Sequence, residues 1–215
     1  MRLKFRSVSV APIIFGFVLG SLLQIFAAQV CWAQEKQTAE SENSIEDPGS
    51  EQSEKLKLEF DGIEFLHRNS EGNLHEFTPA DQEDLEAWTD MLSVIVYPDV
   101  EDGDDLAEIA NRVLGLYKGN GDILRTNSIR RTDEKPAEHF IAAVLAGNEF
   151  IESALARFVL VDGTGIGLVR SRRAYGDSAE EVGVWIKENG PKTEETLMDW
   201  DGFPPLADLE ALSKK

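Results

Sequence analysis

The chain has 215 residues, of which 42% are hydrophobic and 28% are charged, and its formal net charge is −19. This length suits one domain with appendages or two small domains, because domains usually contain about 100–150 residues. The single cysteine excludes a disulfide scaffold. The excess of carboxylates argues against general nucleic-acid binding and against docking on anionic lipid, because both need basic surfaces.

Residues 1–33 have the three parts of a secretory signal peptide. Basic residues open the chain, an apolar run covers residues 10–28, and the small residues Cys31 and Ala33 precede a cleavage point before Gln34. An uncleaved membrane anchor is the alternative, because the apolar run approaches the ~20 residues that span a bilayer. We expect cleavage, a periplasmic or secreted location, and no stable membrane insertion or thiol chemistry afterwards.

The segment 34–54 is rich in Glu, Ser and Gln and has no aromatic residue. Such a segment buries too little apolar surface to offset the entropy of ordering, so we expect a disordered acidic linker. The globular domain is expected over residues 55–200. A C-terminal tail follows at 201–215, in which residues 206–212 have the apolar content for one or two helical turns.

Within the domain, period-two alternation and turn residues predict a series of strands. These are residues 56–60, 63–68, 73–77, 91–97, 122–131, 137–146, 149–161 and 166–175. The pattern of residues 149–161 also permits a helix, and that alternative stays open.

Three segments have helical signals. Residues 104–118 carry apolar residues at i, i+3 and i+4, with Asp104 or Asp105 as the expected cap. A short helix is expected over residues 78–88, and a final helical region from Ser178 that Gly190-Pro191 interrupts. Hairpin-linked strands with a few amphipathic helices predict an α+β fold with a largely antiparallel sheet.

Two sequences imitate ligand-binding loops. Residues 163–167 (Gly-Thr-Gly-Ile-Gly) resemble a nucleotide-binding loop, but a strand pattern follows where a helix would be needed, which favours a hairpin. Residues 99–105 resemble a calcium loop. Aligning Gly103 with the glycine of an EF-hand places Pro98 and Val100 at ligand positions, so we favour helix capping and keep a cation site as the alternative.

The histidines His67 and His75 are candidate metal ligands. A five-residue loop in the hairpin of residues 63–77 places His67 opposite His75, whereas a four-residue loop places Phe65 opposite Glu76. We favour the first register, because it matches Phe65 with Phe77. A metal site requires further ligands, and the sequence identifies none, so no cofactor is predicted.

Charge is distributed unevenly along the chain. Residues 121–175 carry eight basic and seven acidic residues, and they hold seven of the nine arginines that follow residue 33. One interpretation is that these arginines pair with acidic helices and the linker. The other is a surface for an anion or an acidic partner, because the guanidinium group binds carboxylate or phosphate at two points. The candidate residues are Arg125, Arg130, Arg131, Arg157, Arg170, Arg172 and Arg173.

The order of the elements resembles a known family. His75-Glu76-Phe77-Thr78-Pro79, then Trp88-Thr89-Asp90-Met91-Leu92, then a strand and a long amphipathic helix, resemble small exported bacterial domains with a PsbP-like fold. PsbP is the extrinsic subunit of the oxygen-evolving photosystem. The resemblance covers residues 56–200 and implies an α/β/α sandwich on an antiparallel sheet, with a non-enzymatic role. It assigns no functional residue, and nothing in the sequence suggests photosynthesis.

These observations favour an exported, non-enzymatic binding or assembly module of the cell envelope. Its partner is expected to be an envelope protein or a small anionic ligand, and not nucleic acid. One alternative is a periplasmic hydrolase that uses carboxylate or histidine chemistry, although Gly-x-Ser-x-Gly and His-Glu-x-x-His are absent from the sequence. A divalent-cation-binding protein is the other alternative.

Overall fold

An eight-stranded antiparallel sheet forms the centre of the domain. The computed structural model describes residues 56–133 and 135–213, so the expected signal peptide (1–33) and linker (34–54) lie outside the described residues. The strands are β1 (Lys57–Phe60), β2 (Ile63–Glu71), β3 (Leu74–Pro79), β4 (Asp90–Tyr97), β5 (Gly121–Ile129), β6 (Glu138–Ala146), β7 (Phe150–Val161) and β8 (Thr164–Tyr175).

The strand order is β1-β2-β3-β4-β8-β7-β6-β5, and each neighbouring pair is antiparallel. β1 and β5 are therefore the two edges of the sheet. The prediction of an α+β fold with a largely antiparallel sheet is confirmed. The segment for which a helix was the alternative forms β7, a strand of 12 residues.

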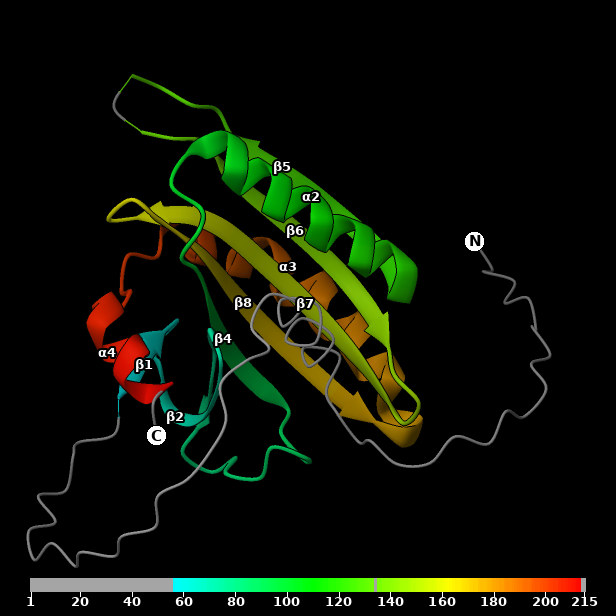
Figure 1. Cartoon of the computed structure of the whole chain (residues 1–215). Coiled ribbons are helices and arrows are strands. Elements are labelled where there is room, and N and C mark those ends of the chain that lie inside the picture. Colours follow the sequence, from blue (N-terminus) through cyan, green and yellow to red (C-terminus); the bar gives the residue numbers. More distant parts are fainter. Residues whose placement is uncertain (1–55, 134, 214–215) are drawn as a thin grey trace, which may run out of the picture. The chain divides into compact units, whose positions relative to one another are not determined.

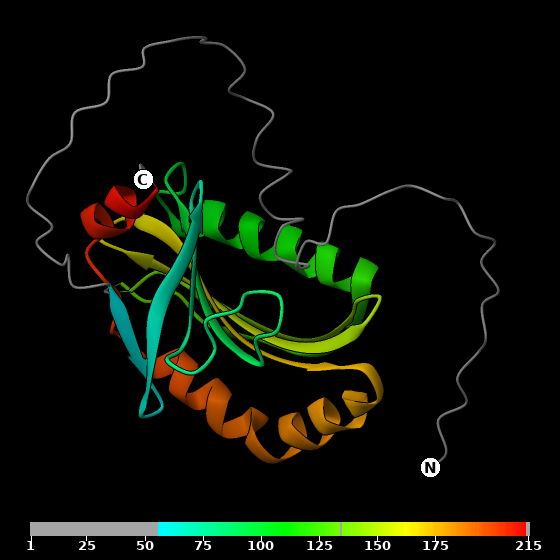
Figure 2. The ribbon, with the colours of Figure 1, turned by 90° about the horizontal axis from the view of Figure 1, so that it is seen from below.

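Helices lie on both faces of this sheet (Figures 1 and 2). α2 (Gly103–Asn120) packs mainly on β5, β6 and β7, and α3 (Ala179–Asp199) packs on β7 and β8 from the opposite face. The short α4 (Leu206–Leu212) follows α3. Leu106, Val113 and Tyr117 are buried on α2, as the i, i+3, i+4 spacing predicts for a helix that covers a sheet.

The main hydrophobic core lies on the α3 side. Phe65 and Phe77 from the first hairpin, Leu92 from β4 and Leu197 from α3 are fully buried there. Leu209 of α4 joins the same cluster, so the C-terminal residues help to close the core. Burial of side chains of this size contributes about 1.5–3 kcal/mol each.

The expected helix over residues 78–88 is absent. β3 continues to Pro79, and the chain then turns, with the N–H of Gln82 donating to the carbonyl of Pro79 at 3.0 Å. The Gln82 side-chain oxygen accepts the N–H groups of Thr89 and Asp90, each at 2.8 Å. These bonds hold the segment as a loop that returns to β4, so tertiary contacts prevail over the local capping pattern.

Other local predictions need smaller corrections. The cap of α2 is Asp102, whose carboxylate accepts the N–H groups of Asp104 and Asp105 at 2.8 and 2.9 Å. α3 was expected to be interrupted at Gly190-Pro191, but it continues through Pro191. An interior proline removes one backbone hydrogen bond, and here the helix tolerates that loss. The glycine-rich segment is a hairpin, as expected, with Asp162 and Gly163 at φ of 50° and 80° in its turn.

Candidate functional site

The seven candidate arginines do not form one surface. Arg157, Arg170 and Arg173 are buried, with side chains 4–7% exposed, and each pairs with a carboxylate. Arg172 is half-buried beside Arg170. Only Arg125, Arg130 and Arg131 are exposed.

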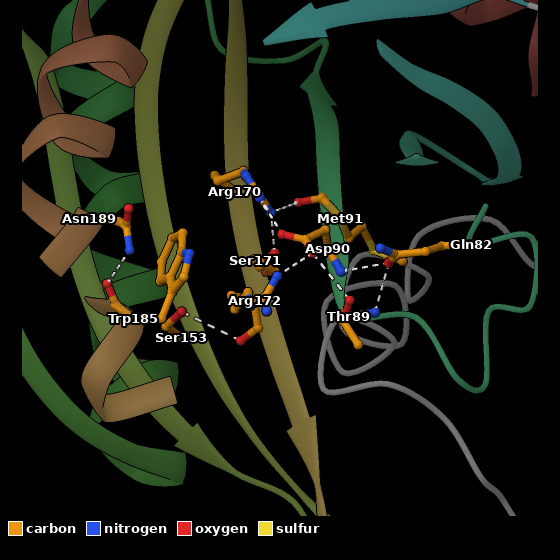
Figure 3. A network of polar contacts seen from close by, with 10 residues as sticks. All are labelled: Gln82, Thr89, Asp90, Met91, Ser153, Arg170, Ser171, Arg172, Trp185 and Asn189. Atoms are coloured by element: carbon orange, nitrogen blue, oxygen red, sulfur yellow. Dashed lines mark hydrogen bonds and ion pairs between the residues drawn. The ribbon is translucent and has the colours of Figure 1, made fainter. Parts of the chain in front are cut away.

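The carboxylate of Asp90 is the centre of one buried network (Figure 3). Its two oxygens accept hydrogen bonds from Arg170 and Arg172 of the neighbouring strand β8. Burial raises the pKa of Asp90, but the charge and hydrogen bonds of Arg170, together with Arg172, outweigh it and hold the pKa below its usual value. The Arg170 guanidinium also lies 5.2 Å from the centre of the Phe65 ring. This network joins β4 to β8 and to the first hairpin.

Arg157 forms a second internal junction. Its Nη2 lies 2.7 Å from Glu138 Oε2 on β6, and its Nη1 donates to the carbonyls of Leu197 and Trp200 at 2.9 and 2.6 Å. These carbonyls lie at the C-terminal end of α3, where helices leave acceptors without an internal partner. Arg157 therefore caps α3 against the sheet.

Arg173 lies on the other face of the sheet. Its Nη2 is 2.7 Å from Glu152 Oε2, and its guanidinium carbon lies 4.0 Å and 3.8 Å from the ring centres of Trp88 and Phe150. Two aromatic faces and one carboxylate thus enclose this cation. The four internal arginines hold the fold together and leave no common anion-binding surface among them.

The remaining three arginines gather at the β5 edge. Arg125 extends from β5 with its side chain 62% exposed, and its Nε lies 3.1 Å from Glu194 Oε2 on α3. Arg130 and Arg131 follow directly after the strand and are exposed. In the part of the chain that the structure describes, no ion pair holds either of them.

The same edge exposes apolar side chains. Leu124 and Ile129 of β5 are 49% and 46% exposed, and the strand is open to solvent over most of its nine residues. An edge strand of this length presents unpaired backbone N–H and C=O groups, which pair readily with an added strand. We refer to β5 together with Arg130 and Arg131 as the β5 edge.

The predicted register of the histidine hairpin is wrong. His67 lies opposite Phe77, and His75 lies opposite Ser70. Only Gly72 and Asn73 separate the two strands, and a bulge between His67 and Asn69 shifts the register. The side chain of Arg68, inside this bulge, donates to Thr78 Oγ1 and to the Pro79 carbonyl, both at 2.9 Å.

The two imidazoles nevertheless share one partner. The Ser70 hydroxyl lies 2.8 Å from His67 Nε2 and 2.8 Å from His75 Nδ1. Burial, together with the charge of His67, lowers the pKa of His75 to about 4. His75 is therefore neutral at pH 7.

The structure adds no support for a metal centre. Among residues 56–133 and 135–213, no three His, Cys, Asp or Glu side chains are grouped so that they could hold a metal ion. In the 99–105 turn, the Asp102 carboxylate accepts two backbone N–H groups at the start of α2, which lowers its pKa. That is the geometry of helix capping.

No protein-family model matches the chain, and no curated sequence is significantly similar to it. Among the helices that the structure describes, none combines the length and the hydrophobicity of a membrane span.

Proposed function

We propose that this protein is an exported, non-enzymatic binding module of the cell envelope, which docks an acidic, extended segment of a partner along the β5 edge. The signal-peptide pattern and the resemblance to PsbP-like domains support the periplasmic or secreted location and the non-enzymatic role. The exposed edge strand with arginines at its end supports the mode of binding.

Backbone pairing supplies the affinity in this proposal. A partner segment that adds a ninth strand beside β5 satisfies backbone groups that the open edge leaves to water. Leu124 and Ile129 provide apolar contacts along the strand. This mode requires an extended partner, because a helix cannot continue the hydrogen-bond ladder of a sheet.

Charge selects the partner. The protein as a whole is strongly acidic, so it repels most anionic surfaces at long range. Arg130 and Arg131, which follow β5 and have no ion pair among the described residues, form a local exception at one edge, where carboxylates of a bound segment meet guanidinium groups. An acidic segment therefore fits this edge and is repelled by most of the remaining surface.

The test uses two fluorescent octapeptides, alternating Glu-Val and alternating Lys-Val, titrated with the purified protein and followed by anisotropy. We expect saturable binding of the Glu-Val peptide, whereas the attraction of the Lys-Val peptide to the acidic surface should not weaken when Arg130 and Arg131 are replaced. The double variant R130E/R131E should weaken binding by about tenfold, because two attractive contacts become repulsive. The variant K187E/K192E, with the same change in net charge on α3, should bind as the wild type does. Equal affinities of the two variants, or no binding to the wild type, would overturn the proposal.

A further inference from the structure

The β5 edge carries opposite charges at its two ends. Asp122 is the second residue of the strand, whereas Arg130 and Arg131 follow its last residue. All three residues are exposed, and none of them forms an ion pair with another described residue. About 27 Å separates the two ends, because an antiparallel strand rises about 3.4 Å per residue. The screening length at physiological ionic strength is only about 8 Å, so a bound segment meets the two charges separately.

The regular part of this edge lies next to the arginines. The pairing of β5 with β6 shifts between Ile123 and Arg125, so Leu124 lies in a bulge near the start of the strand. A bulge interrupts the hydrogen-bond ladder locally. From Arg125 to Ile129 the pairing runs without a further shift. An added strand therefore finds its uninterrupted template in this second part of β5, directly before the two arginines.

The rest of the sheet favours one direction for an added strand. Every neighbouring pair of strands in the sheet is antiparallel. Antiparallel pairing is also slightly more stable per residue than parallel pairing. A segment antiparallel to β5 places its first residues beside Arg130 and Arg131 and its last residues beside Asp122. Carboxylates at its N-terminal end then meet guanidinium groups, and a basic residue at its C-terminal end meets a carboxylate.

We propose that the partner segment runs antiparallel to β5, with acidic residues at its N-terminal end and a basic residue at its C-terminal end. This inference rests on the function proposed above and adds the direction and the charge order of the bound segment. One apolar position follows from the same alignment. When the first two residues of the segment lie opposite Arg131 and Arg130, its third residue lies opposite Ile129. The side chain of Ile129 is 46% exposed, so an apolar or β-branched residue at this third position forms a cross-strand contact with it.

The test compares two decapeptides of identical composition by isothermal titration calorimetry with the purified protein. One is Glu-Glu-Val-Thr-Val-Thr-Thr-Val-Thr-Lys, and the other has the same residues in reverse order. Both are acetylated and amidated, which removes the terminal charges. We expect the first peptide to bind about tenfold more tightly, because in an antiparallel ladder only this peptide matches the charges at both ends of β5.

Two variants of the protein show whether the arginines cause this preference. In R130E/R131E the first peptide should lose its tenfold advantage, because its glutamates then meet like charges. The variant K187E/K192E, which makes the same change in net charge on α3, should keep the preference of the wild type.

The outcomes separate this inference from the proposed function. Tighter binding of the reversed peptide would indicate a parallel strand, which overturns the proposed direction and leaves the β5 edge as the docking site. Equal affinities of the two peptides, or an unchanged preference in R130E/R131E, would also overturn the direction. If neither peptide binds, the proposed function fails, and the inference that rests on it fails as well.

Discussion

Replacing Asp90 by alanine is expected to destabilise the domain by about 3–5 kcal/mol, because it leaves a buried guanidinium without its carboxylate. The Arg170 side chain is only 6% exposed, and Asp90 is its single ion-pair partner among the described residues. The loss also frees Arg172, which shares the same carboxylate. Urea unfolding followed by circular dichroism measures the effect as a lower midpoint.

Matched variants separate this network from general effects of charge. Asp81 is exposed in the loop before β4, so D81A should change the free energy of unfolding by less than about 0.5 kcal/mol. R172A removes a partner whose side chain is 35% exposed and should cost less than D90A. If D90A and D81A unfolded at the same urea concentration, Asp90 would not hold β4 to β8.

Acidification from pH 7 to pH 4 is expected to reduce stability through His75. Its pKa falls from 6.5 in the unfolded chain to about 4 in the fold, so the unfolded state binds more protons between these values. The contribution of neutral His75 to the free energy of unfolding is complete above pH 6.5 and is lost as the pH falls toward 4. A shift of this size corresponds to at most about 3.4 kcal/mol.

The contribution of His75 is isolated by comparison with H75Q, which cannot gain a proton. We expect the free energy of unfolding to differ most between the two proteins at pH 7 and progressively less toward pH 4. Glu76 has a raised pKa and acts in the opposite direction, but it is present in both proteins and cancels in the difference. A difference that stays constant between pH 7 and pH 4 would contradict the burial of a neutral imidazole.

Local patterns predicted most of the strands, because period-two alternation and turn residues act over a few neighbouring positions. The segment after β3 shows the limit of this information. Thr78-Pro79-Ala80-Asp81 has the composition of a helix start, but the decisive contact is made by the Gln82 side chain with Thr89 and Asp90. That contact follows from the path of the chain and leaves no local signal.

The candidate sites depended still more on contacts between distant residues. Arg172 and Asp90 are separated by 82 positions, so the sequence located the positive charge without its partner. One face of the sheet carries Glu76, Ser93, Ser171 and Glu152, which come from four different strands. Only the strand register shows that they share one face. The order of these strands in the sheet differs from their order in the chain, so no local pattern in the sequence brings these residues together.

Amide hydrogen–deuterium exchange with the alternating Glu-Val octapeptide tests the central claim most directly. A segment that pairs with the β5 edge protects the outward N–H groups of that strand. We predict slower exchange confined to residues 121–129 when the peptide saturates the protein, with no change in β1, the opposite edge. Protection of β1, of another part of the sheet, or of no strand at all would contradict the assignment of β5 as the docking edge.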